Sequence, residues 1–137
     1  MATMTAEQRD AFLREARIAT LITLYADGTP AAVPVWFEWD GERARLFTGR
    51  SSEKIRRVQA NPRVALCVAE PAGVPEAWVT IEGTATVLPG GWALAQRLAP
   101  RYYGAERAAK ALVEWGAKPE QWAVVEIAPR RIRSLAP

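Results

Sequence analysis

The chain has 137 residues, a formal net charge of +3, one cysteine and no histidine. The missing histidine excludes Ser-His and Cys-His hydrolases, and it also disfavours zinc and haem ligation. Half of the residues are apolar, but no apolar run is long enough to span a bilayer. We therefore expect one soluble, cytoplasmic domain over residues 1–137, with no membrane partner.

A helix is expected over residues 5–16, because Thr5 and Gln8 have the spacing of a capping box. Strands joined by short turns follow, over residues 19–25, 31–39 and 43–48. The last turn contains Asp40-Gly41, a strong hairpin signal. Three strands in such close succession predict an antiparallel meander.

Pro34 lies inside the second of these strands, where it cannot donate a hydrogen bond to a neighbouring strand. It therefore marks an edge strand, a bulge or a place where a ligand meets the backbone. In the functional interpretation, Val33, Pro34, Val35 and Trp36 line a planar ligand. The plain structural alternative is an edge-strand proline.

The second half of the sequence predicts three more strands and a helical pair. Strands are expected over residues 63–70, 77–88 and 122–128, the last with an extension over 130–135. Gly83, in the middle of a strand, indicates a bend or a close approach of another group. Two helices over 92–103 and 105–115 are divided at Gly104. The fold class is therefore mainly β, a β-barrel with helices, since barrel closure removes open sheet edges.

The segment from Thr48 to Lys54 is the strongest candidate for chemistry. Ser51 or Ser52 is suited to cap the basic helix that follows, which is the structural interpretation. In the functional interpretation, an anion binds at the start of this helix. Its ligands would be the hydroxyls of Thr48 and Ser52, the backbone at Gly49, and the cations of Arg50 and Lys54. Further along the helix, Arg56 and Arg57 serve either the same anion or a solvated face.

Four segments in this order resemble the flavin-binding split β-barrel family, which includes pyridoxamine-phosphate-oxidase-like proteins and their small deazaflavin-using relatives. They are ATLITLYADGTPAAVPVWF, LFTGRSSEK, IRRVQANPRVAL and WVTIEGTATVL, and together they cover roughly residues 15–88. The arginine-rich substrate motif of full-length pyridoxamine-phosphate oxidases is not found here.

The resemblance implies a six-stranded antiparallel split barrel of the FMN-binding type. It also implies a homodimer with two cofactor sites between the subunits. Ser52 and Lys54 would hold a phosphate with Thr48 nearby, and residues 33–36 would lie along a flavin or deazaflavin ring. Trp78 would be supplied across the dimer interface.

The leading hypothesis is thus an oxidoreductase that transfers hydride between flavin mononucleotide (FMN) or the deazaflavin coenzyme F-420 and a small organic substrate. FMN ends in one phosphate, whereas coenzyme F-420 has a longer acidic tail. Such a tail would suit the cations Arg50, Arg56 and Arg57 and the C-terminal group Arg130, Arg131 and Arg133. Catalytic residues are not identified, and no metal site is expected.

Two hypotheses from other classes remain beside it. One is a flavin or pigment carrier on the same barrel that catalyses no reaction. The other is a nucleic-acid module that uses the basic helix. It is disfavoured because most aromatic residues lie on strands with apolar neighbours and the net charge is modest.

Overall fold

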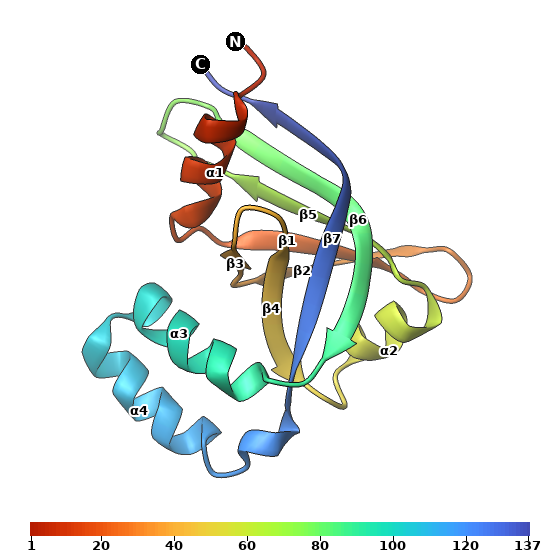
Figure 1. Ribbon diagram of the computed structural model, residues 1–137, viewed down its shortest axis with the longest axis vertical. Helices are drawn as coiled ribbons and strands as arrows, with labels where there is room; N and C mark the ends of the chain where they lie inside the picture. The colour runs from red at the N-terminus through yellow and green to blue at the C-terminus, as the bar shows by residue number, and fades with distance from the viewer.

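One curled antiparallel sheet carries the fold in the computed structural model, which describes residues 1–137 (Figure 1). Its strands are β1 (Ala19–Leu24), β2 (Pro30–Val35), β3 (Glu38–Trp39), β4 (Ala44–Gly49), β5 (Arg63–Ala69), β6 (Trp78–Leu88) and β7 (Trp122–Leu135). The helices are α1 (Ala6–Arg14), α2 (Glu53–Ala60), α3 (Gly91–Tyr103) and α4 (Ala105–Trp115), and a 3₁₀ turn spans Pro119–Gln121. None of the helices is both long enough and apolar enough to cross a membrane.

The order of strands across the sheet is β2-β1-β5-β6-β7-β4-β3, and every neighbouring pair is antiparallel. The predicted count of six strands was wrong, because residues 31–39 form two strands instead of one. The predicted meander was wrong in one pairing as well. β2 pairs with β1 only, whereas β4 pairs with β3 and β7.

The two strands at the sheet edges, β2 and β3, follow each other in the chain and are linked by Trp36 and Phe37. The curl of the sheet therefore ends at a break in strand pairing, not at a hydrogen-bonded seam. At this break the hydroxyl of Tyr102 accepts a hydrogen bond from the Phe37 amide at 3.2 Å. It also lies 2.9 Å from the carbonyl oxygen of Arg17, to which it donates.

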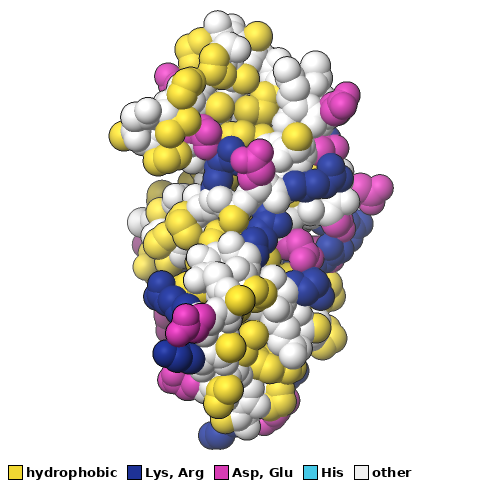
Figure 2. Space-filling model, turned by 90° about the vertical axis from the view of Figure 1, so that its left-hand side faces the viewer, with side chains coloured by type: hydrophobic (Ala, Val, Ile, Leu, Met, Phe, Trp, Pro, Cys, Tyr) yellow, Lys and Arg dark blue, Asp and Glu magenta, His cyan; other side chains and the backbone are white.

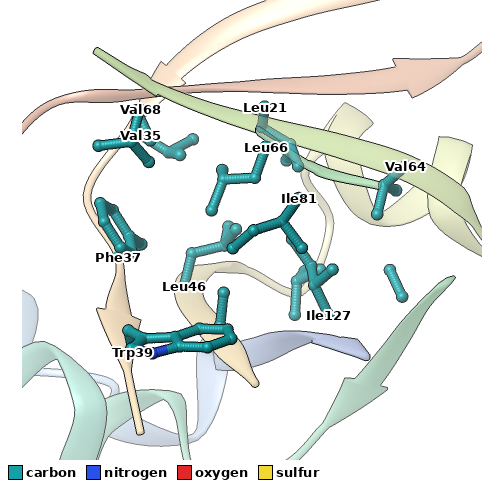
Figure 3. Close-up of a cluster of buried hydrophobic side chains, with 14 of the residues drawn as sticks. Leu21, Val35, Phe37, Trp39, Leu46, Val64, Leu66, Val68, Ile81 and Ile127 are labelled. Carbon is teal, nitrogen blue, oxygen red and sulfur yellow. The ribbon is translucent and has the colours of Figure 1, made fainter. Parts of the chain in front are cut away.

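The core fills the inside of the curl (Figure 3). Alternate residues of each strand point inward, as the period of two requires. The fully buried side chains include Leu21, Phe37, Leu46, Leu66, Val79, Ile81 and Ile127. α1 covers one end with Phe12 and Leu13, and α2 covers the other with Ile55 and Val58. The predicted capping box of Thr5 and Gln8 is confirmed.

The prediction for Gly83 is also confirmed. The register between β6 and β7 shifts at Glu82 and Gly83, which is a β-bulge. A Cβ atom on Gly83 would lie only 2.1 Å from the carbonyl oxygen of Ala128. Glycine is therefore required here because another strand approaches the backbone.

In the α3–α4 hairpin, α3 packs on β4 and β7 beside the open side of the curl, and α4 packs against α3 (Figure 1). Leu94 and Leu98 of α3 form a second small core with Val124. The two helices are separated at Gly104, which has a φ of +82°, as the sequence predicted. The hairpin thereby brings its aromatic residues to the break between β2 and β3.

Candidate functional site

A cleft of about 490 Å³ lies at the break in the sheet, and we call it the aromatic cleft. It is lined by Ile18, Pro34, Val35, Trp36, Phe47, Lys54, Tyr103, Trp115 and Trp122. These residues come from the sheet, from the start of α2 and from the α3–α4 hairpin. The lining is mostly aromatic and aliphatic and has a single charged side chain, so it suits a flat apolar group attached to an anion.

The aromatic rings of the cleft pack against one another. Trp36 stacks on Tyr102 at a centroid distance of 4.9 Å and an interplanar angle of 6°. Tyr103 meets the same indole edge-on at 4.6 Å. The rings of Phe47 and Trp122 lie 5.7 Å apart. Such offset and edge-to-face pairs hold the cleft walls in fixed positions.

Trp36 also offers main-chain groups to a ligand. It lies between β2 and β3, outside any strand pairing, and neither its N–H nor its C=O makes a hydrogen bond within the chain. Unpaired main-chain groups in protein interiors are rare, whereas an exposed edge can bond a ligand. The sequence prediction that residues 33–36 meet a ligand through the backbone remains a prediction, and Trp36 is the residue whose geometry fits it.

Lys54 supplies the charge at the cleft. It lies in the first turn of α2, where Ser52 caps the helix and its Oγ accepts from the Ile55 amide at 3.4 Å. The amides of Glu53 and Lys54 donate to no group of the chain. Burial, and then the positive charge of Arg57, lower the pKa of Lys54, and no carboxylate acts in the opposite direction. An anion at this position would therefore gain a cation that has no partner in the chain, together with the helix dipole.

The two other arginines of α2 differ from Lys54 and from each other. Arg57 donates from Nε to the buried hydroxyl of Thr23 at 2.6 Å, and its guanidinium lies over the ring of Tyr25 at 5.2 Å. Arg56 is exposed and forms an ion pair with Glu53 at 3.0 Å. Arg56 thus belongs to a solvated face, whereas Arg57 is tied to β1 beside Lys54.

The remaining residues of the predicted phosphate site lie outside the aromatic cleft. Thr48 is buried, with 7% of its surface exposed, in register with the inward-facing residues of β4. Gly49 has open space where a side chain would stand. Arg50 lines a different cleft of about 300 Å³, together with Ile55 and Gln59. Within the chain, only Lys54 of this set reaches the aromatic cleft.

Two further predicted residues also lie elsewhere. Val33 is half-buried and packs against the main core, on the opposite face of β2 from Pro34. Trp78 begins β6, where it pairs in register with Ala69 and Leu135. It does not line the aromatic cleft of its own chain, so a role at the site would require a second copy.

The C-terminal arginines are not gathered with Lys54. Arg130 and Arg131 line a separate cleft of about 590 Å³ with Arg63, and Arg133 forms an ion pair with Glu82 at 3.2 Å. On the face shown in Figure 2, basic and acidic side chains are interspersed. The cations that the sequence analysis considered for a long acidic tail are thus spread over several surfaces.

Sequence reasoning missed four residues of the cleft lining, namely Ile18, Phe47, Trp115 and Trp122. The only signal available for the two tryptophans was the high tryptophan content, six in 137 residues. Tryptophan is common both in cores and at binding surfaces, so the count alone does not separate the two.

The chain has recognisable relatives. A family model described as pyridoxamine 5'-phosphate oxidase matches residues 5–136. A 5a,11a-dehydrotetracycline/5a,11a-dehydrooxytetracycline reductase from Streptomyces rimosus is 44% identical over 87 residues, which cover 58% of this chain and 61% of the relative. A pyridoxine/pyridoxamine 5'-phosphate oxidase from Anaeromyxobacter dehalogenans is 41% identical over 76 residues, or 55% of this chain and 37% of the relative. The chain thus spans less than two thirds of the length of either relative.

Among solved structures, an F420 reductase superposes with a TM-score of 0.74 at 26% identity. The superposition covers 90% of this chain and 94% of that protein. The curled sheet with its helical hairpin is therefore a known architecture, and it occurs in a protein named as a reductase.

Proposed function

Since this chain belongs to the pyridoxamine 5'-phosphate oxidase family, we propose that it is an oxidoreductase that binds a flavin-type cofactor, FMN or coenzyme F-420, in the aromatic cleft. The relatives named above are reductases and an oxidase, which supports this reaction class. When bound, such a cofactor would supply hydride transfer to or from a small organic substrate.

One observation carries the proposal. The free main-chain groups of Trp36 and the ammonium of Lys54 belong to the same cleft, whose other walls are aromatic. A tricyclic ring with polar edges and a phosphate tail presents the complementary groups. Lys54 and the free amides of the first turn of α2 would hold the phosphate, and Pro34 to Trp36 would flank the ring.

Tyr102 and Tyr103 have different roles in this scheme. Burial raises the pKa of Tyr102, whose hydroxyl is already bonded to main-chain groups at the break. Tyr102 therefore stays protonated and positions Trp36 by stacking. Tyr103 lines the cleft, so its hydroxyl is a candidate proton source for a bound substrate; solvent is the alternative.

We further propose that the active unit is a homodimer. Trp78 is half-buried on β6 and does not reach the aromatic cleft of its own chain. A second copy could bring this indole to the cofactor. Light scattering at increasing protein concentration tests the assembly, and a mass that stays monomeric at high concentration would refute it.

The cofactor proposal is tested by titrating the purified protein with FMN and with coenzyme F-420 while tryptophan fluorescence is followed. Quenching by one of them is expected, because several indoles lie around the cleft. Lys54→Ala should weaken binding by about 1.5–3 kcal/mol, the contribution of a charge-assisted hydrogen bond. Arg56→Ala is the matched control on the same helix.

The outcomes separate the competing functions. If neither cofactor binds, the proposal is wrong. If one binds but the reduced form transfers no hydride to any acceptor in a panel of quinones, enones and nitroaromatics, the chain is a carrier. Equal affinities of Lys54→Ala and the native protein would remove Lys54 from the proposed phosphate site.

A further inference from the structure

Trp115 lines the aromatic cleft from the end of the helical hairpin. It is the last residue of α4, and its ring centroid lies 5.9–6.2 Å from those of four other aromatic residues: Trp36, Phe47, Tyr103 and Trp122. No other side chain of the α3–α4 hairpin touches as many rings of the cleft. The position of this one indole therefore sets the shape of the helical wall.

The backbone of Trp115 is fixed by its surroundings. Its carbonyl oxygen accepts a hydrogen bond from the Trp122 indole N–H at 2.9 Å. The next residue, Gly116, ends the helix, and a Cβ there would lie 2.8 Å from the Leu112 oxygen and 2.9 Å from the Trp92 ring. Trp115 is thus held in place before any ligand arrives, which lowers the entropic cost of binding.

Two indole donors of the cleft have no acceptor. The indole N–H groups of Trp39 and Trp122 are bonded to Asp10 and to the Trp115 carbonyl, respectively. Those of Trp36 and Trp115 bond no group of the chain. Both nitrogens are accessible to solvent, because Nε of Arg101 is the only unpaired side-chain polar atom that is fully buried. An apolar wall with free N–H donors is suited to a flat molecule that carries acceptor oxygens.

The charged residues at the cleft further restrict the class of substrate that it can bind. Lys54 is the only charged residue in the lining, and the proposed function assigns it to the cofactor phosphate. Arg107 is not part of the lining, and its guanidinium is stacked 3.7 Å from the centroid of the Tyr103 ring. A phosphorylated or carboxylated substrate would thus find no second free cation in the lining, and its charge would be desolvated without a partner.

We propose that Trp115 is the substrate-positioning residue of this cleft. The substrate class that it selects is a neutral, flat, conjugated ketone or quinone, which stacks on the aromatic wall and accepts a hydrogen bond from the Trp115 indole. This inference rests on the proposed function for the assignment of Lys54, but the subsite can be tested without any cofactor.

The test compares two bicyclic probes, chromone with its ring ketone and naphthalene without it. Indole N–H resonances of the ¹⁵N-labelled native protein should shift with chromone, and that of Trp115 should shift most. Trp115→Phe keeps an aromatic ring and loses the donor. It should weaken chromone binding roughly three- to tenfold, the effect of one neutral hydrogen bond, and leave naphthalene binding unchanged. Val113→Ala is the control, because this neighbour in α4 is 81% exposed.

The selectivity between the probes is the decisive readout, because a merely structural role of Trp115 would weaken both equally. Equal losses for both probes, or no loss for either, would overturn the proposal. So would an equal loss of cofactor affinity in Trp115→Phe, since the indole would then belong to the cofactor. If chromone binds selectively but neither cofactor binds, the subsite stands and the proposed function fails.

Discussion

Two regions of the same sheet differ in how their main-chain N–H and C=O groups are hydrogen-bonded. In the first, β6 is paired along its length with β7, and from Trp78 to Thr84 it is paired with β5 as well. In the second, at the break between β2 and β3, strand pairing stops for Trp36 and Phe37. The amide of Phe37 is satisfied by the Tyr102 hydroxyl, while the main-chain groups of Trp36 have no partner.

This difference indicates why the candidate site lies where it does. A fully paired strand has no main-chain group left for a ligand, so it can contribute only side chains. The break leaves an N–H and a C=O free beside aromatic rings and a cation. Its geometry depends on a single side chain from α3, so it should also be more sensitive than β6 to the loss of one hydroxyl.

The largest effect is expected from Gly83→Ala in β6, the region of continuous strand pairing. The added Cβ would stand 2.1 Å from the Ala128 oxygen, and two backbones would have to separate. We expect a loss of about 3 kcal/mol or more in the free energy of unfolding, at the upper end for overpacked sites. Urea denaturation measures it. Gly49→Ala, which has open space around the new methyl group, should unfold near the native midpoint, and equal midpoints for both variants would contradict the assignment.

The sequence predicted the continuous region well and the break poorly. In β6, alternation and the isolated Gly83 are local signals, so both the faces and the bulge could be predicted. Across the break, Val35, Phe37 and Trp39 remain buried in alternation. The side-chain pattern therefore continues where the strand pairing does not. The break arises from sheet curvature and from Tyr102, which lies 65 residues after Phe37 in the chain.

A smaller effect is expected from Tyr102→Phe at the break. The ring can still stack on Trp36, but the Phe37 amide and the Arg17 carbonyl lose their partner. Leaving buried main-chain groups unpaired costs about 1–3 kcal/mol. Urea denaturation should show this loss, together with a change in the Trp36 indole resonance. Tyr25→Phe at an exposed tyrosine is the control, and an unchanged stability of Tyr102→Phe would mean that the break is held by packing alone.

The pH dependence of cofactor binding tests the charged end of the cleft. Burial and the charge of Arg57 lower the pKa of Lys54 below its ordinary value of 10.5. An anion binds the protonated form, so affinity should fall as the pH rises through this lowered pKa. We expect the fall in affinity to begin at a lower pH than an ordinary lysine would give. Lys54→Arg stays charged and should bind with little pH dependence, and it meets the same ligand ionisations as the native protein. Parallel profiles for the two proteins would exclude Lys54 as the titrating group.

In the candidate site, as in the fold, local features could be predicted from the sequence and tertiary packing could not. Ser52 and Lys54 could be predicted because the start of a helix is a local feature with known chemistry. The proposed placement of Thr48 and Arg50 depended on which way each residue faces, and that is decided by the register of β4 with β7. Trp115 and Tyr103 reach the cleft only through the docking of the α3–α4 hairpin, and no local pattern encodes that docking.

The smallest effect is expected from Arg56→Gln, which tests whether the exposed face of α2 takes part in cofactor binding. The Arg56–Glu53 pair is exposed, so its loss should change the free energy of unfolding by less than about 0.5 kcal/mol. Affinity for FMN should not change, because Arg56 is paired with Glu53 and does not line the cleft that would hold the single phosphate. We expect the same for coenzyme F-420, measured in parallel titrations at low salt. A loss confined to coenzyme F-420 would contradict this expectation. It would show that the longer acidic tail of this cofactor runs along the exposed face of α2. Arg56 would then have to exchange its ion pair with Glu53 for one with the tail.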